Sequence, residues 1–209
     1  MSQPPKTERK PRADGLRSRE TILRAAAGLA TVDGLEGISI GNLASHIGMS
    51  KSGLYAHFAS KEELQLATVE TALEIFSGEV VEPTADIEDP LERLRALCAA
   101  FLSHLERRVF QGGCFFVSVE AEFDTHPGPV RDRIRVIQRG WSRRLQQLIA
   151  EAQRRGRLRA DEDPAQLAFE LDAYMLMGNT SFVLHDDAAF LHRAAEALER
   201  RLDEAATGV

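Results

Sequence analysis

The chain has 209 residues, of which 44% are hydrophobic, and a formal net charge of −6. This is enough apolar material for one larger domain or two small ones. No apolar run approaches the roughly eighteen residues of a membrane span, and residues 1–16 contain no apolar segment of the kind found in secretory signals. The two cysteines, Cys98 and Cys114, are too few for a disulfide framework and lack the spacing of a metal site. We therefore expect a cytoplasmic protein without a membrane span, metal or cofactor.

Charge is distributed unevenly along the chain. Residues 1–61 hold nine Lys and Arg against five Asp and Glu, whereas residues 62–209 hold seventeen against twenty-seven. The net charge is therefore +4 in the first segment and −10 in the second. This asymmetry makes the N-terminal segment the candidate for a polyanionic partner, because the acidic remainder would repel one.

The N-terminal region begins with an arm and continues with a helix. Residues 1–16 hold three prolines and little apolar surface, too little to offset the entropy of ordering them, so we expect a flexible basic arm. From Arg17 to Asp33, apolar residues recur at helical spacing over a wide face, and Gly34 follows as a stop signal.

Three serines mark the starts of the next three helices. Ser39 precedes apolar residues at i, i+3, i+4 and i+7, and Gly48 ends that pattern. Ser50 is placed to cap a second short helix, and Ser60 with Glu63 three residues later reads as a capping box for a longer one. The helices predicted in this way are 39–47, 50–58 and 60–81.

The two short helices, separated by a glycine-containing turn, predict a helix-turn-helix whose second helix can lie in the major groove of DNA. Leu54 and Phe58 share one face of that helix, which we expect to pack against the first. Ser50 leaves a helix N-terminus facing outward, where backbone N–H groups favour a phosphate. The opposite, polar face is free to contact DNA, and it carries Lys51, Ser52, Gly53, Tyr55 and His57.

Helical patterns continue through the second half. Asp89 followed by Pro90 is a strong helix start, and a core stripe with spacings of three and four residues follows it. The stripe is Leu91, Leu94, Cys98, Phe101 and Leu105. Residues 117–123 alternate apolar and polar side chains, which taken alone favours a strand. Further apolar stripes predict three more helices: 130–156, 164–185 and 188–205.

Most aromatic residues outside the DNA-binding half fall on these later elements. Small-molecule pockets are mostly apolar with a few polar anchors, so these residues are candidates for a ligand cavity, with plain core packing as the alternative. The apolar candidates are Phe101, Phe110, Phe115, Phe116, Phe123, Trp141, Tyr174 and Met177. The polar candidates for orienting a ligand are His104, Glu120 and Asn179.

Residues 19–64, including the ending "LYAHFASKEEL", resemble the N-terminal DNA-binding domain of the TetR family of bacterial transcriptional regulators. The resemblance implies that residues 112–123 are helical, and that a second, all-helical domain forms a homodimer and holds an inducer pocket. For Tyr55 we expect a packed ring with its hydroxyl on a phosphate. Gly41 stands where many members carry a longer polar or basic side chain. The positions that match family DNA contacts are Ser39, Lys51, Ser52, Gly53, Tyr55, His57 and Lys61, the first and last of them on phosphates.

The resemblance also implies a dimer interface, because the last two helices of family members usually pair with their copies. Their apolar stripes supply the interface candidates, with an intramolecular core as the alternative. The candidates are Leu171, Tyr174, Gly178, Phe182, Leu191, Ala195, Leu198 and Leu202.

Together these patterns predict an all-α protein of about nine helices. A helix-turn-helix domain at residues 17–62 is expected to precede a larger ligand-binding and dimerisation domain at residues 63–209. The expected function is that of a repressor that binds a palindromic operator in double-stranded DNA and is released by a small-molecule inducer. A thiol-based redox regulator using Cys98 and Cys114 is the first alternative, and a small helical enzyme is the second. We expect no enzyme activity, because the sequence has no Gly-rich phosphate loop, metal-binding His pair or nucleophile elbow.

Overall fold

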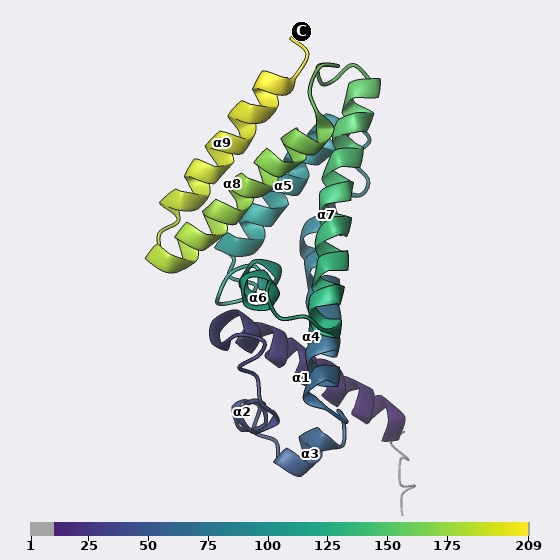
Figure 1. Ribbon diagram of the computed structural model, residues 1–209, viewed down its shortest axis with the longest axis vertical. Coiled ribbons are helices and arrows are strands. Elements are labelled where there is room, and N and C mark those ends of the chain that lie inside the picture. The colour runs from purple at the N-terminus through teal and green to yellow at the C-terminus, as the bar shows by residue number, and fades with distance from the viewer. Residues whose placement is uncertain (1–10, 209) are drawn as a thin grey trace, which may run out of the picture.

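The computed structural model describes residues 11–208, and this part of the chain folds into nine α-helices without a strand. The all-α architecture predicted from the sequence is therefore confirmed. Figure 1 shows α1 to α3 at one end, while α5, α7, α8 and α9 extend toward the other. The helices are α1 (Pro11–Asp33), α2 (Ile40–His46), α3 (Lys51–Tyr55), α4 (Lys61–Phe76), α5 (Pro90–Glu106), α6 (Phe115–Phe123), α7 (Pro129–Arg154), α8 (Pro164–His185) and α9 (Ala189–Ala205).

The N-terminal domain is a small bundle in which α1 packs against α4 and α2 packs against α3. Ala26, Ala27 and Ala30 of α1 are fully buried, which lets neighbouring elements approach that helix closely. Leu43 of α2 and Leu54 of α3 are also fully buried. The apolar faces read from the sequence therefore build one core beneath the two short helices.

Two boundaries in this domain differ from the sequence prediction. Helix α1 begins at Pro11 and not at Arg17, so residues 11–16 are helical, while residues 1–10 of the predicted arm lie outside the described residues. Helix α3 ends at Tyr55, because the chain then turns and buries Phe58, which is 1% exposed. The prediction of an arm over 11–16 and of a helix to residue 58 was wrong.

Helix α4 begins as predicted but ends earlier. The Ser60 hydroxyl accepts the Glu63 N–H at 3.0 Å, whereas the Glu63 carboxylate accepts the N–H of Ala59 at 2.8 Å. Only half of the predicted capping box is therefore formed. The regular α-helix ends at Phe76. The chain then continues as a π-helix over Ser77–Val81 and as a 3₁₀ turn over Glu82–Thr84.

The second domain packs α5, α7, α8 and α9 together, and α6 lies between α8 and α1. The Asp89 carboxylate accepts the N–H of Leu91 at 2.9 Å and caps α5 as predicted. Helix α6 confirms the helix that the family resemblance implied, although it begins at Phe115 and leaves residues 112–114 outside it. Its alternating pattern favoured a strand, but the buried residues fall at helical spacing: Phe115, Phe116, Val119 and Phe123.

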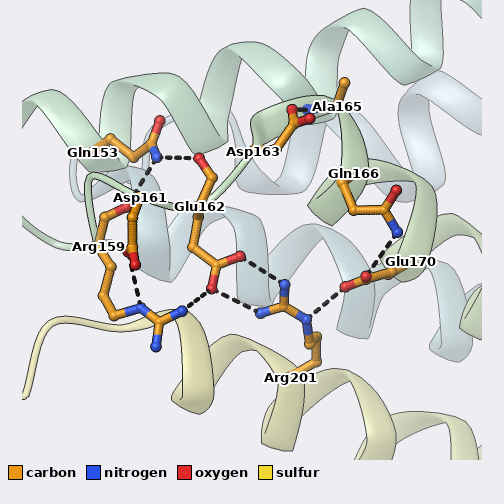
Figure 2. A network of polar contacts seen from close by, with 9 residues as sticks. All are labelled: Gln153, Arg159, Asp161, Glu162, Asp163, Ala165, Gln166, Glu170 and Arg201. Atoms are coloured by element: carbon orange, nitrogen blue, oxygen red, sulfur yellow. Dashed lines mark hydrogen bonds and ion pairs between the residues drawn. The ribbon is translucent and has the colours of Figure 1, made fainter.

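The loop between α7 and α8 is tied to α9 by a polar network (Figure 2). Arg201 of α9 pairs with Glu162 at 2.7 Å and with Glu170 of α8 at 2.6 Å. Arg159 approaches the same Glu162 carboxylate at 2.6 Å, and the Gln153 amide donates to the carbonyl of Glu162 at 2.8 Å. Because Glu162 is shared by two guanidinium groups, the network fixes the loop that sets the orientation of α8.

Among the helices described, none combines the length and the apolar character that crossing a membrane requires.

Candidate DNA-binding surface and ligand cavity

The two short helices are fixed by their serine caps. The Ser39 hydroxyl accepts the Asn42 N–H at 3.1 Å while the Asn42 side chain accepts the Ser39 N–H at 2.7 Å, which completes a capping box. The Ser50 hydroxyl accepts the Gly53 N–H at 3.1 Å at the start of α3. A Cβ on Gly53 would lie 3.1 Å from that hydroxyl, so glycine relieves crowding in the cap itself.

The polar surface that the sequence assigned to DNA, on α3 and the turn after it, is solvent-facing. Lys51 and Ser52 are exposed, and Gly53 and His57 are partly exposed. Tyr55 is 61% exposed, so the expectation of a packed ring was wrong. Its neighbours Leu54 and Phe58 fill the core, and α3 is too short to turn a third large side chain inward.

The absence of a side chain at Gly41 leaves space for the side chain of Lys51. A Cβ at position 41 would lie 3.2 Å from Cε of Lys51, so the lysine chain lies across the backbone of α2. A longer residue at position 41 would compete with Lys51 for this space.

Lys61 is engaged within the protein. Its ammonium group donates to the Glu36 carbonyl at 2.6 Å and to the Glu36 carboxylate at 2.9 Å. Hydrogen bonds from Lys61 and from Gln65 lower the pKa of Glu36. A phosphate contact from Lys61 therefore has to compete with a neighbouring carboxylate.

A link that sequence reasoning missed joins the two domains. The Glu122 carboxylate of α6 accepts the backbone N–H of Leu35 at 2.8 Å and that of Glu36 at 2.7 Å. These N–H groups belong to the turn before α2, where Gly34 has φ +78°. No sequence signal pairs a glutamate with backbone groups 86 residues away.

A cavity of about 270 Å³ lies in the second domain. Of the predicted ligand residues, Phe101, Phe116, Glu120 and Trp141 line it. The wall also includes residues from α4, α7 and α8 that the sequence did not single out as ligand candidates: Phe76, Arg133, Ile137, Gln138, Arg144, Asp172 and Leu176.

The other predicted ligand residues lie elsewhere. His104 is buried in the core between the rings of Phe76 and Phe110. Met177 is 63% exposed on the outer face of α8. Asn179 is buried, and its side-chain oxygen accepts the N–H of Cys114 at 2.8 Å, which is a structural role. Those that do not line the cavity are His104, Phe110, Phe115, Phe123, Tyr174, Met177 and Asn179.

Two acidic side chains, Glu120 and Asp172, are among the polar residues that line the cavity. Burial and the nearby charge of Asp172 raise the pKa of Glu120 to about 7. Burial also raises the pKa of Asp172, although the Trp141 indole N–H donates to its carboxylate at 2.9 Å and opposes the shift. The Gln138 amide donates to Glu120 at 3.2 Å.

The predicted dimer stripe is mostly internal. Leu171, Leu198 and Leu202 are buried between helices of one protomer. Gly178 allows α8 to approach α9, because an added Cβ would lie 2.8 Å from Cβ of Ala194. Phe182 and Leu191 are also buried, while Tyr174 and Ala195 are partly buried. The intramolecular alternative was therefore correct for the buried members of the stripe.

The outer face of α8 carries a different apolar stripe, here called the outer α8 stripe. It holds five of the eight large apolar side chains that are exposed among the described residues. These are Phe169, Leu176, Met177, Val183 and Leu184. An exposed apolar patch of this kind marks an interaction surface.

The two cysteines do not support a redox sensor. Both are buried, and burial raises the pKa of Cys98 to about 12 and that of Cys114 to about 11. A thiol must ionise and be reached by an oxidant to react, and neither thiol meets both conditions.

The fold and its exposed, capped helix-turn-helix define a DNA-binding transcriptional regulator. Residues 22–68 match the family model described as bacterial regulatory proteins, tetR family. Residues 90–198 match the model described as tetracyclin repressor-like, C-terminal domain. The chain therefore belongs to the TetR family, as the sequence resemblance indicated.

Individual relatives also match most of the chain. The chain is 27% identical over 173 residues to the transcriptional regulator AcuR of Cereibacter sphaeroides, covering 79% of each protein. It is 29% identical over 139 residues to the nucleoid occlusion factor SlmA of Vibrio campbellii, covering 64% of this chain and 67% of SlmA.

Solved structures share the fold over nearly the whole chain. A TetR transcriptional regulator from Chloroflexus aurantiacus has a TM-score of 0.86 and 27% identity, covering 93% of this chain and 98% of that one. AibR, solved in complex with isovaleryl coenzyme A and operator DNA, has a TM-score of 0.69 and 26% identity, covering 86% of this chain and 95% of the AibR chain.

Proposed function

We propose that this regulator is a homodimeric repressor that binds a palindromic operator and releases it when a small molecule occupies the cavity. In this proposal, residues 17–62 bind DNA and residues 63–209 bind the ligand and the second protomer. The protein would act in the cytoplasm, where its operator DNA lies.

The observation that carries the proposal is the position of α6. Glu120 of this helix lines the cavity, and Glu122 holds the turn before α2. A ligand that displaces α6 would therefore shift the DNA-reading helices. Such a ligand releases DNA only by its differential affinity for the two arrangements.

The DNA-binding half of the proposal rests on the exposed polar face of α3. Lys51 and Ser52 are exposed at the first turn of α3, where they would contact base edges, and the α3 N-terminus at Ser50 would bind a phosphate. A two-fold dimer would place two such helices in major grooves one helical turn apart, or a multiple of it.

The outer α8 stripe supports the dimer. Its apolar side chains, from Phe169 to Leu184, run along one helix and are exposed in the described part of the protomer, although Leu176 also lines the cavity. AibR, which shares the fold, was solved with a ligand and operator DNA together, and this supports a regulator that binds both a small molecule and operator DNA.

The experiment is an unbiased selection of duplex DNA from a random pool, followed by binding measurements at several salt concentrations. We expect a palindrome to be enriched, and its affinity to fall steeply with salt because phosphate contacts release counterions. Lys51→Ala should relax preference at one base position, at a cost of about 1 to 3 kcal/mol there. Recovery of no preferred sequence, or binding indifferent to salt, would contradict the proposal.

A further inference from the structure

The cavity in the second domain has a definite chemical character. Its aromatic wall is centred on Phe76, whose ring makes edge contacts with Trp141 at 5.3 Å, Phe116 at 5.9 Å and Phe101 at 6.3 Å between centroids. All four rings line the cavity. Aromatic faces attract cations, most strongly where water is excluded.

Two carboxylates share this space without a cationic partner. Glu120 receives a hydrogen bond from the neutral Gln138 amide, and Asp172 receives one from the Trp141 indole. Among the residues that the structure describes, no Lys, Arg or His lies within 4.0 Å of either carboxylate. Buried carboxylates are costly unless a positive charge compensates them.

The two arginines at the cavity do not supply that charge. Arg133 forms a bidentate ion pair with Glu70 of α4, with one contact at 2.7 Å. Arg144 is exposed and makes no ion pair with Glu120 or Asp172. With Arg133 balanced by Glu70, the cavity lining holds two carboxylates, Glu120 and Asp172, against the exposed Arg144, so ionisation of both leaves one negative charge unbalanced beside the aromatic rings.

We infer that the cavity binds an organic cation, an amine or quaternary ammonium with an apolar body, whose charge lies between Glu120, Asp172 and the aromatic wall. This inference rests on the proposed function and names its ligand class. The raised pKa of Glu120, which reflects burial and Asp172, is consistent with a carboxylate that lacks its counter-charge.

The test uses three probes of similar size and different charge. They are phenyltrimethylammonium, its neutral isostere tert-butylbenzene and the anion 4-tert-butylbenzoate, titrated against the full-length protein at constant ionic strength. Binding is followed by calorimetry and by the fluorescence of Trp141, the single tryptophan. We expect the cation to bind at least about tenfold more tightly than either other probe and to quench Trp141.

Variants then assign the charge preference to residues. Glu120→Gln and Asp172→Asn should each remove most of the preference for the cation while leaving the neutral probe unaffected. Glu74→Gln removes an exposed carboxylate from α4 outside the cavity lining and should keep the preference. Thermal melting of each variant checks that it is folded.

A measurement on the unmodified protein gives independent support. The cation favours ionised Glu120, so its affinity should increase as pH rises through about 7, while that of the neutral probe stays constant. The other titratable or charged groups that line the cavity are Asp172 of α8, Arg133 and Arg144 of α7 and the Cys114 thiol.

Equal or tighter binding of the neutral or anionic probe would overturn the inference, as would failure of the cation to bind at millimolar concentration. A cation preference that survives in the Glu120→Gln/Asp172→Asn double variant would also overturn it. None of these outcomes bears on the operator selection, which tests the proposed function separately.

Discussion

Glu122 of α6 accepts the backbone N–H of Glu36 at 2.7 Å, and through this bond the second domain holds the turn that leads into α2. The same carboxylate accepts the N–H of Leu35 at 2.8 Å. Glu122 lies two residues beyond Glu120, which lines the cavity, on a helix of nine residues. The cavity and the DNA-binding domain are thus joined by one short helix.

Removing this carboxylate should weaken the junction. We expect Glu122→Ala to lower the free energy of unfolding by about 2 kcal/mol, because two N–H groups lose a charged acceptor. Chemical denaturation measures the change. Asp124→Ala, an exposed acidic residue just after α6, is the control and should stay within about 0.5 kcal/mol of wild type. Equal effects of both substitutions would show that the Glu122 contacts contribute little.

Gly34 should tolerate no side chain beside this contact. Gly34 has φ +78° and an added Cβ would lie 2.9 Å from the Glu122 carboxylate, whereas Gly48 has φ +69° with no atom within 4 Å. Gly48→Ala should therefore lower the free energy of unfolding by about 1 kcal/mol through backbone strain alone. Gly34→Ala should lower the free energy of unfolding by at least about 1 kcal/mol more than Gly48→Ala does, because it also displaces the Glu122 carboxylate. Similar melting temperatures for the two variants would contradict the role of this contact.

The helices could be read from the sequence because local spacing determines them. Caps such as Ser39 and Asp89 and the stripe from Leu91 to Leu105 depend on neighbours within a few residues. Helix α3 was predicted too long because burial of Phe58 is as compatible with a turn as with a helix. Its solvent-exposed polar side chains were nevertheless identified, since the opposite face was marked by apolar residues.

The cavity and the outer face of α8 could be predicted only in part. Helix α8 is apolar on two sides, and periodicity cannot tell that Leu171 faces the core while Leu184 faces solvent. No sequence pattern indicates that Asp172 lines the cavity, because its hydrogen-bond partner Trp141 is 31 residues away on another helix. Contacts between distant segments decide both features, and one sequence does not reveal them.

Glu36 should restrain DNA binding. The Glu36 carboxylate forms an ion pair with Lys61 and adds negative charge beside the expected phosphate contact. We expect Glu36→Gln to tighten operator binding up to about fivefold, since exposed ion pairs contribute at most about 1 kcal/mol. Lys61→Ala should instead weaken binding to all sequences alike and lower the salt slope by about one. Fluorescence anisotropy across a salt series measures both, and weaker binding by Glu36→Gln would refute the competition.

The outer α8 stripe should form the dimer. Leu184 is 75% exposed, so Leu184→Glu should leave the protomer folded while placing charge in the interface. We expect monomers in analytical ultracentrifugation and a loss of operator affinity of at least about a hundredfold, because the two half-sites no longer act together. The control is Val136→Glu, an exposed apolar residue of α7, which should leave the dimer intact. A dimeric Leu184→Glu protein would place the interface elsewhere.

Stability should depend on pH through Glu120. Burial and Asp172 raise its pKa from 4.5 to about 7, so the folded protein holds a proton that the unfolded chain releases at lower pH. The resulting stabilisation is complete below about pH 4.5 and disappears as pH rises through about 7. Other groups also titrate here, among them His104, whose pKa burial lowers to about 4. The quantity to measure is therefore the difference in unfolding free energy between wild type and Glu120→Gln, by urea denaturation at several pH values. We expect the wild type to lose stability relative to the variant across this window, and phenyltrimethylammonium to restore it above about pH 7 by supplying the missing counter-charge. A difference that does not change with pH would mean that Glu120 is solvated and titrates as it does in the unfolded chain.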